Sequence, residues 1–187
     1  MRRLRNPYLP GLILALTGLA RPWLEASMAR HMLLELPLLF LAGWLAAHAG
    51  VGAARRRQLR AYRPALLLAA LLISGVWMLP LALDYAMTMP AAHGVKVLGM
   101  LAAGFLAGVA WRDAGAVMQG FFMVNWAWMT ITAGLLYQDA PRQLCSVYLS
   151  DQQSTAGSGL VALAATLLCI WLLEAVFFPA LASTHES

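Results

Sequence analysis

The sequence is dominated by long apolar runs that are separated by short polar connections. A membrane-spanning helix needs roughly 20 mostly apolar residues, with about 17 as the lower limit. Five runs reach this length, and the run that comes first in the chain is shortened by Arg21. Pro37 and Pro80 predict kinks in the second and third runs. The sequence therefore predicts an all-α, polytopic transmembrane helical bundle with six spans, at about residues 8–23, 28–47, 64–83, 93–111, 114–137 and 160–181.

The composition supports a membrane protein with a single domain. Only 11% of the 187 residues are charged, whereas a soluble domain carries about 25%. The net charge of +5 comes from twelve arginines and one lysine, which gather in short clusters between the apolar runs rather than along one solvated face. This pattern excludes a nucleic-acid-binding protein and predicts that residues 1–187 form one integral membrane domain surrounded by membrane lipids.

The basic residues also indicate how the chain is oriented. Nine arginines lie at the N-terminus and in the connections after the second and fourth spans, and the other four basic residues, Arg21, Arg30, Lys96 and Arg142, lie on the opposite side. Because basic loops stay in the cytoplasm, both termini are predicted to be cytoplasmic, in a bacterial-type inner (plasma) membrane. Alternatively, the first segment is a cleaved signal sequence that ends near residue 20, which leaves five spans.

The start of the second span concentrates polar groups in an otherwise apolar helix. Residues three or four apart share one helix face, so Met28, His31 and Glu35 lie on the same side. A charged group within a bilayer is costly, and such a group is by default functional and faces other parts of the protein. The sequence therefore predicts a site at the outer end of the bundle.

Other connections deliver similar groups to the same side of the membrane. Two methionines precede the fourth span, which His93 begins. Thioether and imidazole ligands together suit Cu(I). The predicted copper ligands are His31, His93, Met28, Met32, Met87 and Met89. The residues predicted to support them are Glu35, which would set the tautomer of His31, together with Asp84, Asp151, Gln152 and Gln153.

Each of these residues also has a structural interpretation. Methionine is an ordinary packing residue, and a histidine at a helix start, such as His93, suits a solvated interface. His31 and Glu35 are also suited to a hydrogen-bonded pair that only holds helices together. The copper hypothesis depends on convergence of the ligands from separate spans.

Three short segments resemble a known family, the CtaG-like assembly factors of caa-type cytochrome c oxidases. The segment 31–34, His-Met-Leu-Leu, followed by Pro-Leu-Leu at 37–39, resembles that family's histidine-methionine helix start. The helix from His93 to Trp111 resembles its second histidine helix, and Asp-Gln-Gln at 151–153 with Gly157 resembles its acidic-glutamine segment. Ser27 stands where the family pattern has a further histidine, for which Met28 is a substitute.

The resemblance implies a copper-binding assembly factor for a respiratory copper oxidase, which holds or delivers Cu(I) on the outer face. Its implied partner is a cytochrome oxidase subunit or a periplasmic copper chaperone. We expect no enzymatic turnover, because the sequence has no nucleotide-binding loop and no serine-histidine-acid set. The alternatives are a copper transporter, a haem-binding electron carrier with His31 and His93 as axial ligands, and a structural membrane subunit.

Overall fold

The computed structural model of the protein describes residues 7–139, 148 and 150–183, with side chains up to residue 175. This part of the chain is helical and contains no strand. In chain order, the helices are α1 (Tyr8–Leu19), α2 (Arg21–Glu25), α3 (Met28–Arg30), a π-helix (His31–Glu35), α4 (Leu36–Gly50), α5 (Ala53–Gln58), a 3-10 helix (Arg60–Tyr62), α6 (Arg63–Val76), α7 (Pro80–Thr88), α8 (Pro90–Ala110), a 3-10 helix (Trp111–Asp113), α9 (Gly115–Asp139) and α10 (Ser150–Ser183).

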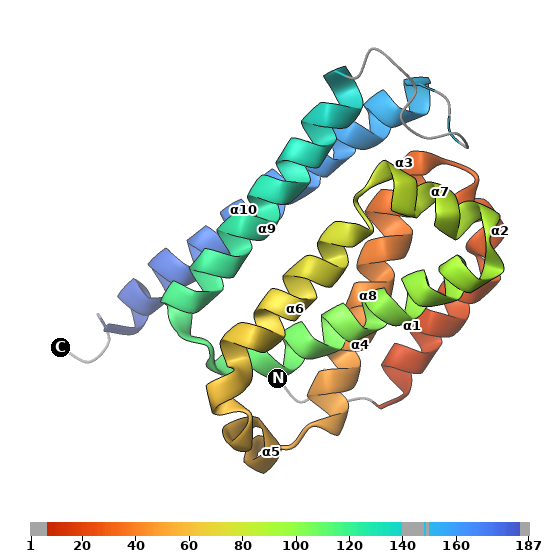
Figure 1. The fold of residues 1–187 in the computed structure, drawn as a ribbon. Coiled ribbons are helices and arrows are strands. Elements are labelled where there is room, and N and C mark those ends of the chain that lie inside the picture. The colour runs from red at the N-terminus through yellow and green to blue at the C-terminus, as the bar shows by residue number, and fades with distance from the viewer. Residues whose placement is uncertain (1–6, 140–147, 149, 184–187) are drawn as a thin grey trace.

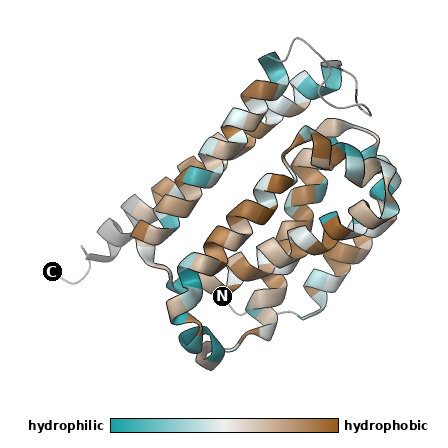
Figure 2. Cartoon of the chain, viewed as in Figure 1, coloured by the Kyte–Doolittle hydropathy of each residue, from teal (hydrophilic) through white to brown (hydrophobic). Residues whose placement is uncertain are grey.

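The helices form a bundle in which α9 and α10 run side by side as one long pair (Figure 1). The rest of the bundle is built on α4, against which both α1 and α8 pack, and α6 packs on α8. The short helices α2, α3 and α7 gather at one end of the bundle, and α5 lies at the other end (Figure 1). Hydrophilic residues gather at α5 and toward the opposite ends of the helices, including the adjoining ends of α9 and α10, whereas apolar residues prevail along the long helices (Figure 2).

Several of these helices could cross a membrane. Residues Met28–Gly50, Pro90–Asp113 and Asp151–Ala175 are long and apolar enough, and α6 with α7 would make a fourth span if the bent pair crosses as one unit. The all-α class is confirmed, and so is the prediction of several apolar helices long enough to cross a membrane. Six clear spans are not found among the described residues: α1 has only 12 residues, and α9 is long but carries polar residues such as Gln119, Asn125 and Thr130.

The predicted third span, 64–83, is broken. Helix α6 ends at Val76 and α7 begins at Pro80, with a bend of 71° between them. Proline is favoured at the first position of a helix and disfavoured inside one, because it has no amide hydrogen and its ring clashes with the preceding turn. The predicted kink at Pro80 is therefore a complete break, and it turns α7 across the end of the bundle.

Glycines allow α4 and α8 to pack with their backbones in contact. A Cβ atom at Gly104 would collide with the backbone carbonyl of Phe40, and one at Gly43 would collide with the carbonyl of Leu101. Small residues at a helix interface are the usual means by which membrane helices approach this closely. This approach sets the distance between the polar residues of the second and fourth predicted spans.

Candidate functional site

The second predicted span contains a π-helix, His31–Glu35, between α3 and α4. Single π-helical turns are rare and frequently lie at functional sites. Pro37 lies two residues after the end of the segment and cannot donate the amide hydrogen that a regular helix would use there. The π-helix places both His31 and Glu35 in the interior, where their side chains are 0% and 4% exposed.

A buried lysine connects two carboxylates beside this π-helix. The Nζ atom of Lys96, on α8, lies 2.7 Å from Oε1 of Glu35 and 3.1 Å from Oε1 of Glu25, on α2. The Lys96 side chain is fully buried. Each carboxylate thus has a cationic partner, which a charge inside a membrane protein requires. Lys96 thereby holds α2, the π-helix and α8 together.

A histidine lies at each end of this charged group. The Nδ1 atom of His31 is 3.0 Å from Oε2 of Glu35, and the Nδ1 atom of His93 is 3.1 Å from Oε1 of Glu25. Arg21 also belongs to the group, because its Nε atom donates to Oε2 of Glu25 over 2.8 Å. We call these six residues the charged network: Arg21, Glu25, His31, Glu35, His93 and Lys96.

The charged network is electrically balanced when its histidines are neutral, because two basic groups face two carboxylates. The pKa of Glu25 shows how its basic partners stabilise the charged carboxylate. Burial by itself raises the pKa of Glu25. The hydrogen bonds from Arg21 and Lys96 lower this pKa by more than burial raises it, so the pKa lies below its ordinary value of 4.5. Balanced pairs are tolerated in a low-dielectric interior, whereas removal of one partner is strongly destabilising.

A methionine cluster lies next to the charged network. Met28 and Met32 are 0% and 2% exposed and belong to one buried cluster, against which Met87 packs from α7. Tyr148 joins the two features. Its hydroxyl donates to the backbone carbonyl of Glu25 over 2.9 Å and contacts Sδ of Met87 at 3.4 Å, and its ring centre lies 6.4 Å from that of His31. We call Met28, Met32 and Met87 the methionine cluster.

The structure brings together some of the predicted copper ligands and separates others. The methionine cluster lies beside His31, as predicted. Met89 is 52% exposed and only caps the start of α8. His93 faces Glu25 at the opposite end of the charged network from His31. Through these contacts, Glu35, Lys96 and Glu25 connect the two imidazoles.

Some of the predicted supporting residues lie at the site, and others do not. Glu35 pairs with His31 as expected, and Asp84 is half-buried on α7. The last span was predicted to begin at about residue 160, but Asp151, Gln152 and Gln153 already lie in the first turn of α10, which begins at Ser150. The side chain of Gln152 accepts a weak hydrogen bond from the amide of Met28 over 3.5 Å, and Gln153 donates to the carbonyl of Tyr148. Asp151 is exposed.

The sequence analysis missed the residues that connect the site. Lys96 was counted only as an outer basic residue, although it is the sole lysine and lies in an apolar run, which was a usable signal of a buried partner. Glu25 lies four residues after Arg21, which predicts a helical ion pair. Tyr148 lies in a polar loop, and nothing local indicated that it would be 3% exposed.

Two sets of side chains could hold a cation. In the part of the chain that the structure describes, carboxylate and imidazole atoms of Glu25, Glu35 and His93 lie within 4.8 Å of one another. The ammonium group of Lys96 contacts both of these carboxylates, so this set already has its cation. The methionine cluster with His31 offers soft ligands instead.

Comparisons with known proteins give a family but no role. The model of the family described as "Protein of unknown function (DUF1404)" matches residues 12–177. No curated protein and no solved structure matches the chain. The resemblance to the CtaG-like assembly factors is therefore wrong, because the chain matches a different family, DUF1404, over most of its length. The three segments behind it were short and consisted mainly of residues common in membrane helices.

Proposed function

We propose that this chain, which belongs to the DUF1404 family, is a multi-pass membrane protein that holds a Cu(I) ion between His31 and the methionine cluster. The observation that carries the proposal is the position of Met87. It lies on a different helix, 55 residues after Met32, yet packs with Met28 and Met32 in one buried cluster. Thioethers and imidazole are the protein ligands that suit Cu(I).

The surroundings of His31 support a role as a ligand. Glu35 lies beside Nδ1, which favours the tautomer with the proton on Nδ1 and leaves the lone pair of Nε2 available to a metal. Nε2 is buried and has no hydrogen-bond partner among the described residues. A buried polar atom without a partner costs free energy, and a bound metal ion would remove that cost.

The proposed topology keeps six crossings with both termini in the cytoplasm of a bacterial-type inner membrane. The crossings would be residues 8–23, the continuous helix Met28–Gly50, the bent pair α6 and α7, then α8, α9 and α10. The arginine-rich α5 lies at the opposite end of the bundle from α3 and α7 (Figure 1). By the positive-inside rule, the methionine cluster would then lie near the outer face.

The alternatives have less support from the geometry. A haem between His31 and His93 would need the space in which Glu35, Lys96 and Glu25 contact one another. A copper transporter would need soft ligands along the bundle, whereas the methionine cluster lies at one end. An oxidase or copper-chaperone partner was implied only by the CtaG-like resemblance, so the proposal includes storage or delivery of Cu(I) and names no partner.

The test compares two conservative variants, Met87→Leu and Met89→Leu. Leucine has nearly the volume of methionine, so neither change should disturb packing strongly. Purified protein would be loaded with Cu(I) under anaerobic reducing conditions in competition with a chelator, and bound copper would be measured by elemental analysis. We expect about one Cu(I) per chain for the wild type and for Met89→Leu, and about tenfold weaker binding for Met87→Leu, which loses one soft ligand.

X-ray absorption at the copper edge provides a second readout, because sulfur ligands are distinguished from nitrogen and oxygen. Sulfur scattering should be present in the wild type and reduced in Met87→Leu. Absence of Cu(I) binding in the folded wild-type protein would refute the proposal. Equal binding by both variants would also refute it, because Met87 would then not be a ligand.

A further inference from the structure

A slot lies between α1 and α8, beside the charged network. Both helices pack against α4, whereas few contacts join α1 to α8 within the described residues. The slot encloses about 280 Å³. This volume lies near the lower end of small-molecule pockets, about 300–1,000 Å³, and suits one ring-sized group rather than a whole lipid.

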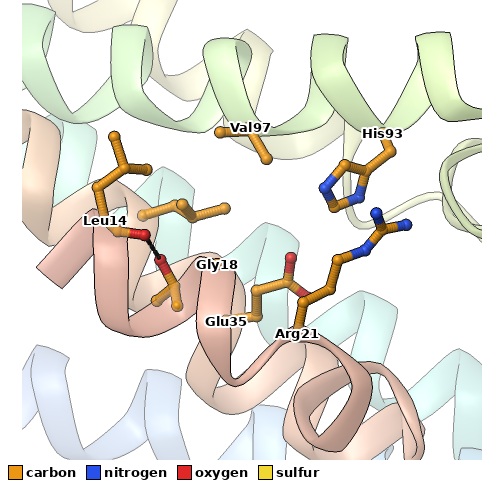
Figure 3. Close-up of a pocket in the computed structure, with 8 residues that line it drawn as sticks. Leu14, Gly18, Arg21, Glu35, His93 and Val97 are labelled. Carbon is orange, nitrogen blue, oxygen red and sulfur yellow. Dashed lines mark hydrogen bonds between the residues drawn. The ribbon is translucent and has the colours of Figure 1, made fainter.

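The slot is polar at one end and apolar at the other. In Figure 3, Arg21, Glu35 and His93 lie together at one end, and Leu14 and Val97 lie toward the other, with Gly18 between. Leu39 and Thr17 complete the lining. The hydroxyl of Thr17 is bonded to the backbone of its own helix, so the side chains that can address a ligand are those at the charged end.

The polar end offers both hydrogen-bond donors and an acceptor. The Nε atom of Arg21 donates to Glu25, which leaves the terminal nitrogens of its guanidinium group as further donors. The Nδ1 atom of His93 faces the same carboxylate, so its proton is favoured there and Nε2 is an acceptor. A hydroxyl group, which both donates and accepts, matches this pair.

The charge of the surroundings favours a neutral ligand. Arg21 and Lys96 already balance Glu25 and Glu35. A carboxylate or an ammonium group placed at this end would therefore add an uncompensated charge beside the buried pair of Lys96 and Glu35, which is costly. A neutral hydroxyl group meets the hydrogen-bonding groups without this cost.

We propose that the slot between α1 and α8 binds a neutral, lipid-soluble hydroquinone, with its ring in the slot, a hydroxyl between Arg21 and His93, and its apolar tail leaving past Leu14 and Val97. The ring fills a volume that a single alkyl chain would leave partly empty. The inference concerns binding only. It does not depend on the copper proposal, because the slot and the methionine cluster have no residue in common.

The experiment uses the full chain in lipid nanodiscs and measures retention of decylubiquinol at equilibrium, with empty nanodiscs as the blank. Two variants of α8 form a matched pair. Val97→Phe places a ring inside the slot, whereas Ala102→Phe adds the same ring in a separate groove lined only by apolar residues and glycine. Leu14→Phe blocks the slot from α1 and serves as an independent second variant if Val97→Phe does not fold.

We expect saturable binding with about one ligand per chain in the wild type and in Ala102→Phe. Val97→Phe and Leu14→Phe should bind at least about tenfold more weakly, because the introduced phenyl ring occupies the volume that the ring of the ligand would fill. The dimethyl ether of decylubiquinol, which has no hydroxyl to donate, should also bind more weakly than decylubiquinol. Retention equal to that of empty nanodiscs, retention that Val97→Phe and Leu14→Phe both leave unchanged, or an equal loss in Ala102→Phe would overturn the inference.

Discussion

The Nζ atom of Lys96 lies 2.7 Å from Oε1 of Glu35, and both side chains are shielded from the surface, with exposures of 0% and 4%. The two residues come from α8 and from the π-helix of the second predicted span, 61 positions apart in the chain. Their ion pair is supported by the close packing of α4 on α8. It links the methionine cluster, through His31, to the slot between α1 and α8.

Replacement of Lys96 by methionine should strongly destabilise the protein. The change leaves Glu25 and Glu35 without the cation that they share, and breaking a buried pair costs about 3–5 kcal/mol. Thermal unfolding in detergent should show a clearly lower Tm. Arg57→Met removes an exposed positive charge and should change Tm little.

The double variant Lys96→Met/Glu35→Gln tests the reason for this loss. It removes the charge of Glu35, which Lys96→Met leaves without a lysine or arginine partner, and should recover part of the lost stability, whereas Glu25 keeps Arg21. If the double variant were less stable than Lys96→Met alone, the loss would come from packing around Lys96 and not from unpaired charge.

Gly104→Ala should separate α4 from α8. A Cβ atom at this position collides with the carbonyl of Phe40, and forcing extra volume into a packed interface costs about 1–3 kcal/mol. Gly94→Ala is the control on the same helix, because a Cβ there meets nothing within 4 Å. Chemical unfolding of both variants should show a loss only for Gly104→Ala, and equal losses would contradict the packing argument.

The stabilising effect of Glu25 should depend on pH. Its pKa in the folded protein lies below 4.5, so its contribution is present above the unfolded-state pKa and is lost as the pH falls through the folded-state pKa. The Tm of Glu25→Gln should therefore lie below that of the wild type at pH 7. The difference should shrink as the pH falls below about 4.5, and a difference that stayed constant into acid would contradict this account.

Tyr148→Phe should cost about 1 kcal/mol, because the hydroxyl that bonds the carbonyl of Glu25 and contacts Met87 is lost while the ring stays in place. Tyr85→Phe is the control, since Tyr85 is 48% exposed. Differential scanning calorimetry of the two variants would check this. An unchanged Tm for Tyr148→Phe would mean that its hydroxyl does not contribute to joining the charged network to the methionine cluster.

Local sequence patterns predicted part of this arrangement correctly. The apolar runs indicated the helices at Met28–Gly50, Pro90–Asp113 and Asp151–Ala175, because length and hydropathy alone decide whether a helix suits a bilayer. The spacing of His31 and Glu35 indicated their pairing, since residues four apart on a helix are neighbours. Pro80 indicated an interruption but not a bend of 71°.

Residues far apart in the chain were harder to pair. His31 and His93 were predicted to share one metal ion because they lie at the same depth, and this stays a prediction; depth did not reveal that His93 lies against Glu25 or that Lys96 pairs with Glu35. The close approach of α8 to α4 at Gly104 and Gly43 accompanies the contacts of Lys96 with Glu35 and of His93 with Glu25. The family resemblance failed for a related reason, because short apolar motifs recur in many unrelated membrane helices.

The amino-acid sequence by itself determined that the chain is a helical protein with several apolar helices, and that a few polar groups enter them near one end. These properties follow from hydropathy and helical spacing, which act within a single segment. Only the tertiary structure decided that Lys96 joins two carboxylates, that Met87 reaches Met28 and Met32, and that a slot remains between α1 and α8. Such contacts depend on how helices rotate and approach each other, and backbone contact at a few glycines sets both.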